Sequence, residues 1–225
     1  MIGLLFGVAS AKSLYSTLYD VENEKPYVVL FVTPKNEYVD QYESEFNSTR
    51  DDLGDICNFI KVDVNKELLL GTRLRIIYTP VIYVFWQGKA HFFPNTEVTK
   101  DKIYSFIAQI IGKSVPMLKE TDIATKKPLV AMFTKRLKAP TALSFAQFNL
   151  SLTDIRFAWT NNKKVIDAFR VNDIPSVYFF KDGIRKKYDG QTDAKKFIEE
   201  IRKHFNVTEL NQAEKDAIKQ ARFEL

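Results

Sequence analysis

The sequence predicts two similar α/β domains in tandem, each built on a mixed β-sheet with helices on both faces. Three observations predict this fold class. The chain has 225 residues and 45% hydrophobic content, enough for two separate cores. An internal repeat covers most of its length. In each copy of the repeat the elements follow the order β-α-β-α-β-β-α, which implies a mixed central sheet.

The repeat is clearest around two prolines. Residues 74–88 align without a gap on residues 169–183, and upstream residues 25–31 align on residues 127–133. Each copy therefore contains the same pair of strands, with a shorter connection between them in the second copy.

Each copy begins with a buried-type strand and continues with a helix, a second strand and a second helix. A strand that starts at a proline, a hairpin turn with glycine and a final helix complete it. The first copy is expected to have strands at 28–32 and 59–64 and helices at 37–50, 67–74 and 101–111. The second is expected to have strands at 129–134 and 155–159 and helices at 141–150, 163–169 and 193–204. The domains are expected at 12–114 and 115–205, with a polar helical tail at 206–225.

Proline at the start of a strand that reads as central needs an unusual backbone, because proline cannot donate to a strand ladder. A cis X-Pro bond is the common solution. The sequence therefore predicts cis bonds at Thr79-Pro80 and Ile174-Pro175.

These loops, each leading into an aromatic strand that ends in Phe-x-x-Gly, resemble the thioredoxin fold over about residues 14–205. In redox-active members of that family a Cys-x-x-Cys pair follows the first long strand. Alignment places Asn36 and Val39 at those positions in the first copy, and Lys138 and Thr141 in the second. The resemblance therefore implies that neither domain carries out dithiol-disulfide chemistry.

The buried carboxylate that relays protons in redox-active members is also replaced here, by Leu30 and Met132. The lone cysteine, Cys57, excludes an intramolecular disulfide and reads as a packing thiol. The two histidines, His91 and His204, show no ligand spacing, so we expect no metal site and no cofactor.

Several features point to the lumen of the endoplasmic reticulum. Residues 1–11 form a short apolar run that ends in small residues, which is typical of a signal peptide, although a first strand or helix is the alternative. The last four residues, Arg-Phe-Glu-Leu, partly match lumenal retention signals. Asn47, Asn149 and Asn206 lie in glycosylation sequons. No stretch is long and apolar enough to span a bilayer.

Taken together, these features resemble the non-catalytic b and b′ domain pair of protein disulfide isomerases and their small lumenal relatives. The resemblance implies binding of unfolded or apolar polypeptide segments, or recruitment of a redox-active folding enzyme. The candidate binding residues all lie in the second domain and are Leu137, Phe145, Phe148 and Ile174. The alternative for Phe145 and Phe148 is that they face the sheet. The corresponding loop of the first domain, residues 35–37, is polar and is expected to bind less well.

Other function classes stay open at this stage. The chain could assist disulfide isomerisation through another subunit's thiols, or act as a scaffold elsewhere in the cell. Calcium storage is disfavoured by the net charge of +5. Lys and Arg alternate with Asp and Glu along the sequence, which predicts a mixed, solvated surface and no nucleic-acid module.

Overall fold

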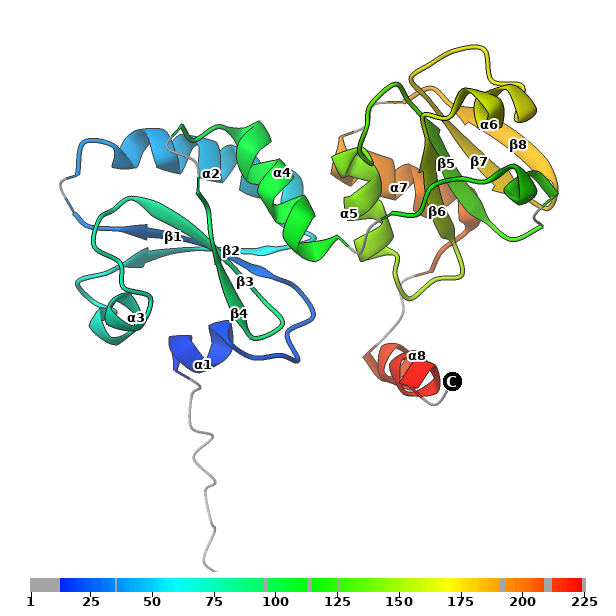
Figure 1. Ribbon diagram of the computed structural model, residues 1–225. Coiled ribbons are helices and arrows are strands. Elements are labelled where there is room, and N and C mark those ends of the chain that lie inside the picture. The colour runs from blue at the N-terminus through cyan, green and yellow to red at the C-terminus, as the bar shows by residue number, and fades with distance from the viewer. Residues whose placement is uncertain are drawn as a thin grey trace, which may run out of the picture.

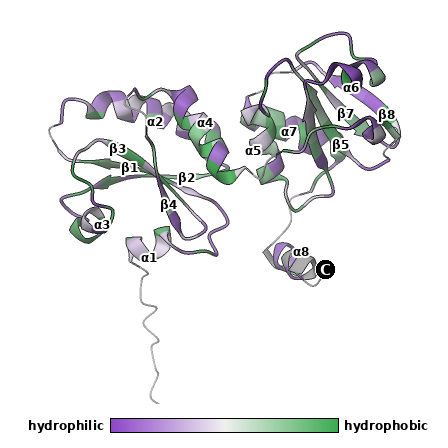
Figure 2. Cartoon of the chain, viewed as in Figure 1, coloured by the Kyte–Doolittle hydropathy of each residue, from purple (hydrophilic) through white to green (hydrophobic). Residues whose placement is uncertain are grey.

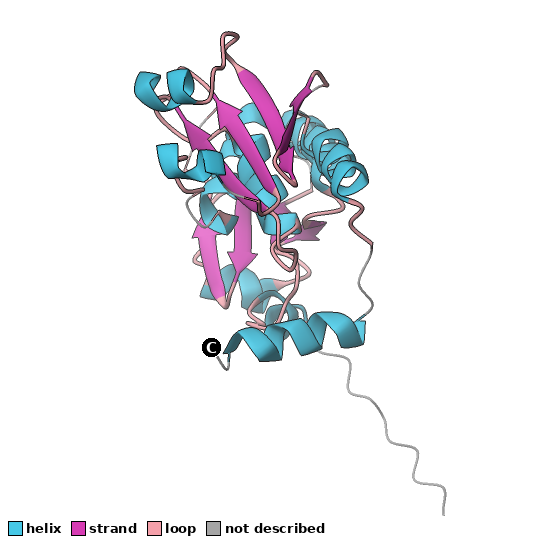
Figure 3. Cartoon of the chain, turned by 90° about the vertical axis from the view of Figure 1, so that its right-hand side faces the viewer, coloured by secondary structure: helices cyan, strands magenta, loops and turns pink. Residues whose placement is uncertain are grey.

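The computed structural model describes residues 13–34, 36–94, 97–112, 115–124, 126–190, 193–208 and 212–223. It contains two four-stranded mixed sheets with helices on both faces (Figures 1 and 3). The strand orders are β2-β1-β3-β4 and β6-β5-β7-β8, so the two sheets have the same topology. In each sheet the first pair of strands is parallel and the other two pairs are antiparallel.

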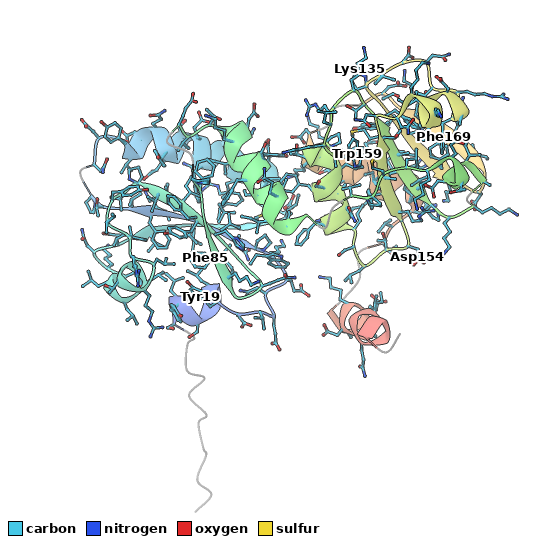
Figure 4. All side chains as sticks on the ribbon, in the orientation of Figure 1. Tyr19, Phe85, Lys135, Asp154, Trp159 and Phe169 are labelled. Carbon is cyan, nitrogen blue, oxygen red and sulfur yellow. The ribbon has the colours of Figure 1, made fainter. Side chains whose placement is uncertain are left out.

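The first sheet and its helices form domain one. Its elements are α1 (Leu14–Leu18), β1 (Tyr27–Val32), α2 (Val39–Leu53), β2 (Asn58–Asp63), α3 (Leu68–Arg73), β3 (Val81–Trp86), β4 (Lys89–Phe92) and α4 (Lys100–Ile111). The short helix α1 was not predicted. It begins because the hydroxyl of Ser13 accepts a hydrogen bond from the amide of Ser16. Just beyond its end, the ring of Tyr19 packs edge-on against Phe85 of β3 (Figure 4).

The second sheet and its helices form domain two. Its elements are η1 (Glu120–Ala124), β5 (Leu129–Phe133), α5 (Thr141–Asn149), β6 (Arg156–Thr160), α6 (Lys163–Ala168), β7 (Ser176–Lys181), β8 (Ile184–Tyr188) and α7 (Ala194–Phe205). The segment before η1 extends this sheet, because the amide of Leu118 donates to the carbonyl of Trp159 at 2.7 Å. The tail helix α8 (Gln212–Phe223) follows, and Lys215 on it lies 3.6 Å from Glu24 of domain one.

The central strands are buried on both faces, with alternate residues in different cores. In β1, Val28 and Leu30 pack with residues of α2 and α4, whereas Val29 and Phe31 pack on the opposite face with Leu70 of α3. Strand β5 repeats this arrangement between α5 and α7 on one face and α6 on the other. Such two-sided burial explains why both strands read as continuous apolar runs.

The repeat also holds at the level of the backbone. The two hairpin turns, Gln87-Gly88 and Asp182-Gly183, have positive φ at both residues. This conformation matches the twist of the flanking strands and favours glycine at the second position. Arg75 and Arg170, at equivalent places before the proline loops, also have positive φ, of 53° and 51°.

One of the apolar cores is shared by the two domains. The rings of Tyr104 on α4 and Phe145 on α5 lie 4.8 Å apart, and those of Trp86 and Phe148 lie 5.4 Å apart. Figure 2 shows hydrophobic residues on both α4 and α5 where these helices meet. Buried residues of the α2–α4 layer and of the α5–α7 layer form a single continuous cluster. The domains are therefore packed together rather than joined only by a linker.

Membrane crossing requires a helix of about 20 mostly apolar residues. None of the helices in the described part of the chain combines that length with that hydrophobicity.

The shared core predicts coupled unfolding of the two domains. Phe145 is fully buried, so Phe145→Ala should lower the free energy of unfolding by about 3–5 kcal/mol. In the Trp159→Phe background, the fluorescence of Trp86 alone reports the unfolding of domain one in urea. The midpoint of this transition should shift to a lower urea concentration when Phe145→Ala is added.

Leu137→Ala is the control, because this side chain is 87% exposed and its loss should change stability by less than about 0.5 kcal/mol. An unchanged Trp86 transition in the Phe145→Ala background would show that the domains unfold independently.

Candidate functional site

We call the segment that leads into Pro80 in domain one, and into Pro175 in domain two, the proline loop. The candidate site of each domain lies at the end of the sheet where the proline loop meets the loop after the first strand. The peptide bonds Thr79-Pro80 and Ile174-Pro175 are cis. The residues that follow these prolines pair with the ends of the first strands, Val81 with Phe31 and Ser176 with Phe133. The two ends are thus equivalent in backbone and can be compared residue by residue.

In domain one, side chains close this end by hydrogen bonding. The side-chain Nδ2 of Asn36 donates to the backbone carbonyl of Thr79 at 2.6 Å. The side-chain Oδ1 of Asn36 accepts from the backbone amide of Tyr38 at 2.9 Å. The hydroxyls of Thr33 and Thr79 are also 2.6 Å apart. Asn36, which aligns with a family cysteine, therefore ties the start of α2 to the proline loop.

Three large exposed side chains belong to the two loops that this hydrogen-bonded bridge joins. Ile77 is 88% exposed, and Tyr38 and Tyr78 are each 59% exposed. Burial, followed by the proximity of Tyr78, raises the pKa of Tyr42, which lies one turn after Tyr38 on α2. We call Tyr38, Ile77 and Tyr78 the aromatic surface of domain one. The expectation that this domain binds less well rested on the polar loop at residues 35–37 and did not consider the residues before Pro80.

An open cleft of about 600 Å³ adjoins the aromatic surface. Its lining combines apolar residues with polar and charged ones, namely Val32, Pro34, Val39, Thr33, Asn36, Glu37, Asp40, Glu43, Lys61 and Asp63. Lys61 pairs with Glu43 at 2.9 Å, which leaves an excess of negative charge in the cleft. The chemistry of this lining favours a cationic group.

The equivalent end of domain two has different side chains. Lys135 and Lys138 stand where domain one has Thr33 and Asn36, and both are exposed. Leu137 between them is 87% exposed, as expected for a binding residue in this loop. Ile174 is partly buried and packs against the core on the face of the sheet that α6 covers. Helix α5 begins at Thr141, the second position that aligns with a family cysteine.

Two of the sequence-predicted binding residues are not at this end. Phe145 is fully buried and packs on Tyr104, and Phe148 packs on Trp86, so both rings lie in the contact with domain one. This packing favours the alternative that the two rings belong to the core. The helical spacing showed an apolar face, but the face covers the partner domain instead of a ligand.

The positions matched to the proton relay and the lone cysteine are buried. Leu30 and Met132, which the thioredoxin resemblance aligns with a proton-relay carboxylate, belong to the core. Cys57 is 1% exposed, and burial raises the pKa of its thiol. Burial also lowers the pKa of His91 and His204, with nearby lysines adding to the effect. Among the described residues, no group of three or more His, Cys, Asp or Glu side chains is arranged to hold a metal ion.

The sequons differ in their surroundings. Asn206 is exposed in a left-handed conformation at the end of α7. Asn47 lies within α2, and Asn149 accepts a hydrogen bond from Arg202 at 3.1 Å.

Residues 1–11, Lys35 and the last two residues of the Arg-Phe-Glu-Leu terminus lie outside the described residues.

The chain is similar to ERdj5 in two crystal structures. Form I superposes with a TM-score of 0.68 at 13% sequence identity, covering 84% of this chain and 28% of that one. Full-length ERdj5 gives a TM-score of 0.66 at 14% identity, covering 86% and 31%. Both domains have the thioredoxin-like fold.

The chain spans less than a third of the length of these ERdj5 chains, and at this identity the likeness concerns the fold. A structure of the first two thioredoxin domains of Naumovozyma dairenensis Eps1p gives a TM-score of 0.38 at 12% identity, covering 92% and 99%, which is too low to bear on the domain arrangement. No protein-family model matches the chain, and no curated protein matches its sequence.

The buried thiol predicts a pH dependence of stability. Because the pKa of Cys57 is higher in the folded than in the unfolded chain, its stabilising effect is complete below pH 8.5 and is lost as the pH rises further. At pH 9.5 the loss should reach about 1.4 kcal/mol.

Urea unfolding at pH 7 and pH 9.5 measures this loss. Cys57→Ala serves as the control, because it removes the thiol and should therefore lose less stability over the same interval. Equal losses in the two proteins would show that Cys57 ionises normally in the folded chain.

Proposed function

We propose that the chain is a redox-inactive, disulfide-isomerase-like protein of the endoplasmic reticulum that binds unfolded polypeptide through domain one. The aromatic surface formed by Tyr38, Ile77 and Tyr78 beside the proline loop carries this proposal. Exposed large apolar side chains gathered at one end of a domain are typical of interaction sites. The absence of thiols from Asn36, Val39, Lys138 and Thr141 supports a binding role without chemistry.

The backbone beside this surface also suits an extended ligand. The amides of Ile77 and Tyr78 donate no backbone hydrogen bond to any described residue. A polypeptide segment can pair with such groups while its side chains contact the neighbouring apolar residues. Backbone pairing tolerates many sequences, which suits binding to unfolded chains.

The acidic cleft narrows the class of segment that fits. Glu37, Asp40 and Asp63 lie beside the aromatic surface, so a ligand that combines an apolar side chain with Lys or Arg gains from both. Segments with clustered acidic residues are disfavoured by like-charge repulsion. We therefore expect domain one to select apolar segments that carry positive charge.

Three sequence features support the lumenal location, namely the apolar run at residues 1–11, the Arg-Phe-Glu-Leu terminus and the sequons. Of the three sequons, the one at Asn206 is the most accessible to a glycosylating enzyme, because this residue is exposed at a helix end. A binding protein without redox chemistry at this location would assist folding by shielding apolar segments.

Charge introduced into the aromatic surface should weaken client binding. Ile77→Asp replaces an apolar contact worth about 1.5–3 kcal/mol, so the affinity for a reduced, carboxymethylated client should fall about tenfold or more. Titration of labelled client by fluorescence anisotropy measures the change.

Ile184→Asp is the matched control, because Ile184 is 73% exposed on β8 of domain two. Both variants should keep the wild-type melting temperature. Binding that survives Ile77→Asp, or that falls equally in the control, would remove the aromatic surface from the function.

Removal of the last four residues should release the protein from the secretory pathway into the medium, because the retention receptor could no longer bind it. Immunoblots of cells and medium measure the release. A mobility shift lost in Asn206→Gln would report passage through the lumen. An unglycosylated protein found in the cytosol with Met1 intact would refute the location.

A further inference from the structure

The two domains carry opposite net charge. Residues 13–112 contain 10 Lys and Arg against 14 Asp and Glu, whereas residues 115–208 contain 18 Lys and Arg against 10 Asp and Glu. The overall charge of +5 therefore averages an acidic domain one and a strongly basic domain two. A surface field of this kind steers partners of the opposite sign.

The basic charge of domain two includes a cluster at its candidate site. Lys135 and Lys138 occupy the positions from which Thr33 and Asn36 close the proline loop of domain one. Arg136 lies between them in sequence, and Lys164 follows the neighbouring strand β6. We call Lys135, Arg136, Lys138 and Lys164 the basic end of domain two. Figure 4 shows Lys135 at the opposite end of the sheet from Asp154.

Hydrogen bonds between side chains and the backbone hold this cluster in place. The amide of Arg136 donates to the hydroxyl of Thr134 at 3.1 Å, and the side-chain amide of Asn161 donates to the carbonyl of Arg136 at 3.0 Å. The second bond joins the loop after β5 to the loop after β6. The four cations are exposed and make no ion pair with a described carboxylate, whereas their neighbour Lys163 pairs with Asp167 at 2.8 Å.

The proline loop beside the basic end is open. In domain one the carbonyl of Thr79 accepts a hydrogen bond from Asn36. No described side chain donates to the equivalent carbonyl of Ile174, and the amide of Ile174 donates no backbone hydrogen bond to a described residue. Backbone groups that can pair with an extended chain therefore lie at the same end of the sheet as Leu137 and the unpaired cations.

We propose that the basic end of domain two docks an extended, acidic segment of a partner polypeptide. The carboxylates of the segment pair with Lys135, Arg136, Lys138 and Lys164, its backbone pairs at Ile174, and one apolar side chain covers Leu137. Charge complementarity selects this partner. The site is separate from the aromatic surface of domain one, which favours segments of the opposite charge.

Three other occupants fit less well. Single-stranded nucleic acid binds through exposed aromatic rings, and the large exposed hydrophobics described in domain two are aliphatic, namely Met117, Ile123, Leu137 and Ile184. A bilayer needs more inserted apolar surface than Leu137 alone provides. The acidic cleft of a second copy is partly neutralised by the pair between Lys61 and Glu43.

The test uses the full chain and a fluorescent 12-residue peptide rich in Glu and Asp with one central Leu. Charge reversal at three positions, Lys135→Glu, Arg136→Glu and Lys138→Glu, should weaken binding at least tenfold. The matched control reverses three exposed lysines elsewhere in domain two, Lys126→Glu, Lys186→Glu and Lys203→Glu, and should weaken binding less than twofold. Leu137→Ser should weaken binding of the Leu peptide but not of the same peptide with Ser in place of Leu.

Equal weakening by both triple variants would overturn the proposal, because it would reduce the effect to net charge. Tighter binding of single-stranded oligouridylate or of phosphatidylserine vesicles, lost in the first triple variant alone, would also overturn it. So would self-association in sedimentation that the acidic peptide does not displace. Normal client binding by the first triple variant would leave domain one's function intact, so the two proposals can fail separately.

Discussion

The contact between the helical layers of the two domains is the constraint on which the rest of the structure depends. Tyr104 and Phe145, with Trp86 and Phe148, join the apolar faces of both domains into one cluster. Either domain alone would expose this surface to water, at a cost of about 25 cal/mol per Å² of apolar area. The contact therefore sets where the aromatic surface and the basic end lie relative to each other.

The sequence predicted the fold because the two kinds of signal that mark its strands, apolar runs and proline or glycine positions, are local in sequence. Alternating burial along β1 and β5 gives apolar runs, and the prolines and hairpin glycines mark the remaining strands. The five-residue helix α1 escaped prediction because it is too short for a helical period to emerge and depends on the contact of Tyr19 with Phe85.

The candidate site was less predictable, because periodicity shows which face of a helix is apolar but not what covers it. Phe145 and Phe148 were assigned to a ligand for this reason, although they cover the neighbouring domain. Leu137 is exposed, since a loop residue between Arg136 and Lys138 has no helix face to bury. The aromatic surface escaped notice because Tyr38 and Tyr78 lie on two loops that a hydrogen bond between Asn36 and Thr79 joins across 43 residues of sequence.

The charge difference between the domains was not predicted for a related reason. Along the sequence Lys and Arg alternate with Asp and Glu, so a linear count suggests a mixed surface. The excess of each sign becomes visible only when residues are grouped by domain. Counting the charged residues separately in each copy of the repeat could have shown this excess. Residues 25–31 and 127–133 already mark equivalent positions, from which the loops of the two copies can be compared.

The two domains also show how one backbone carries two different surfaces. A buried carboxylate beside β1 or β5 would cost several kcal/mol of desolvation. Leu30 and Met132 keep these places apolar. Arg75 and Arg170 have the same positive-φ backbone before the two proline loops. In domain one the side chain of Asn36 donates to the proline loop, whereas in domain two an exposed lysine stands at the equivalent position. The same backbone thus presents two surfaces of opposite charge.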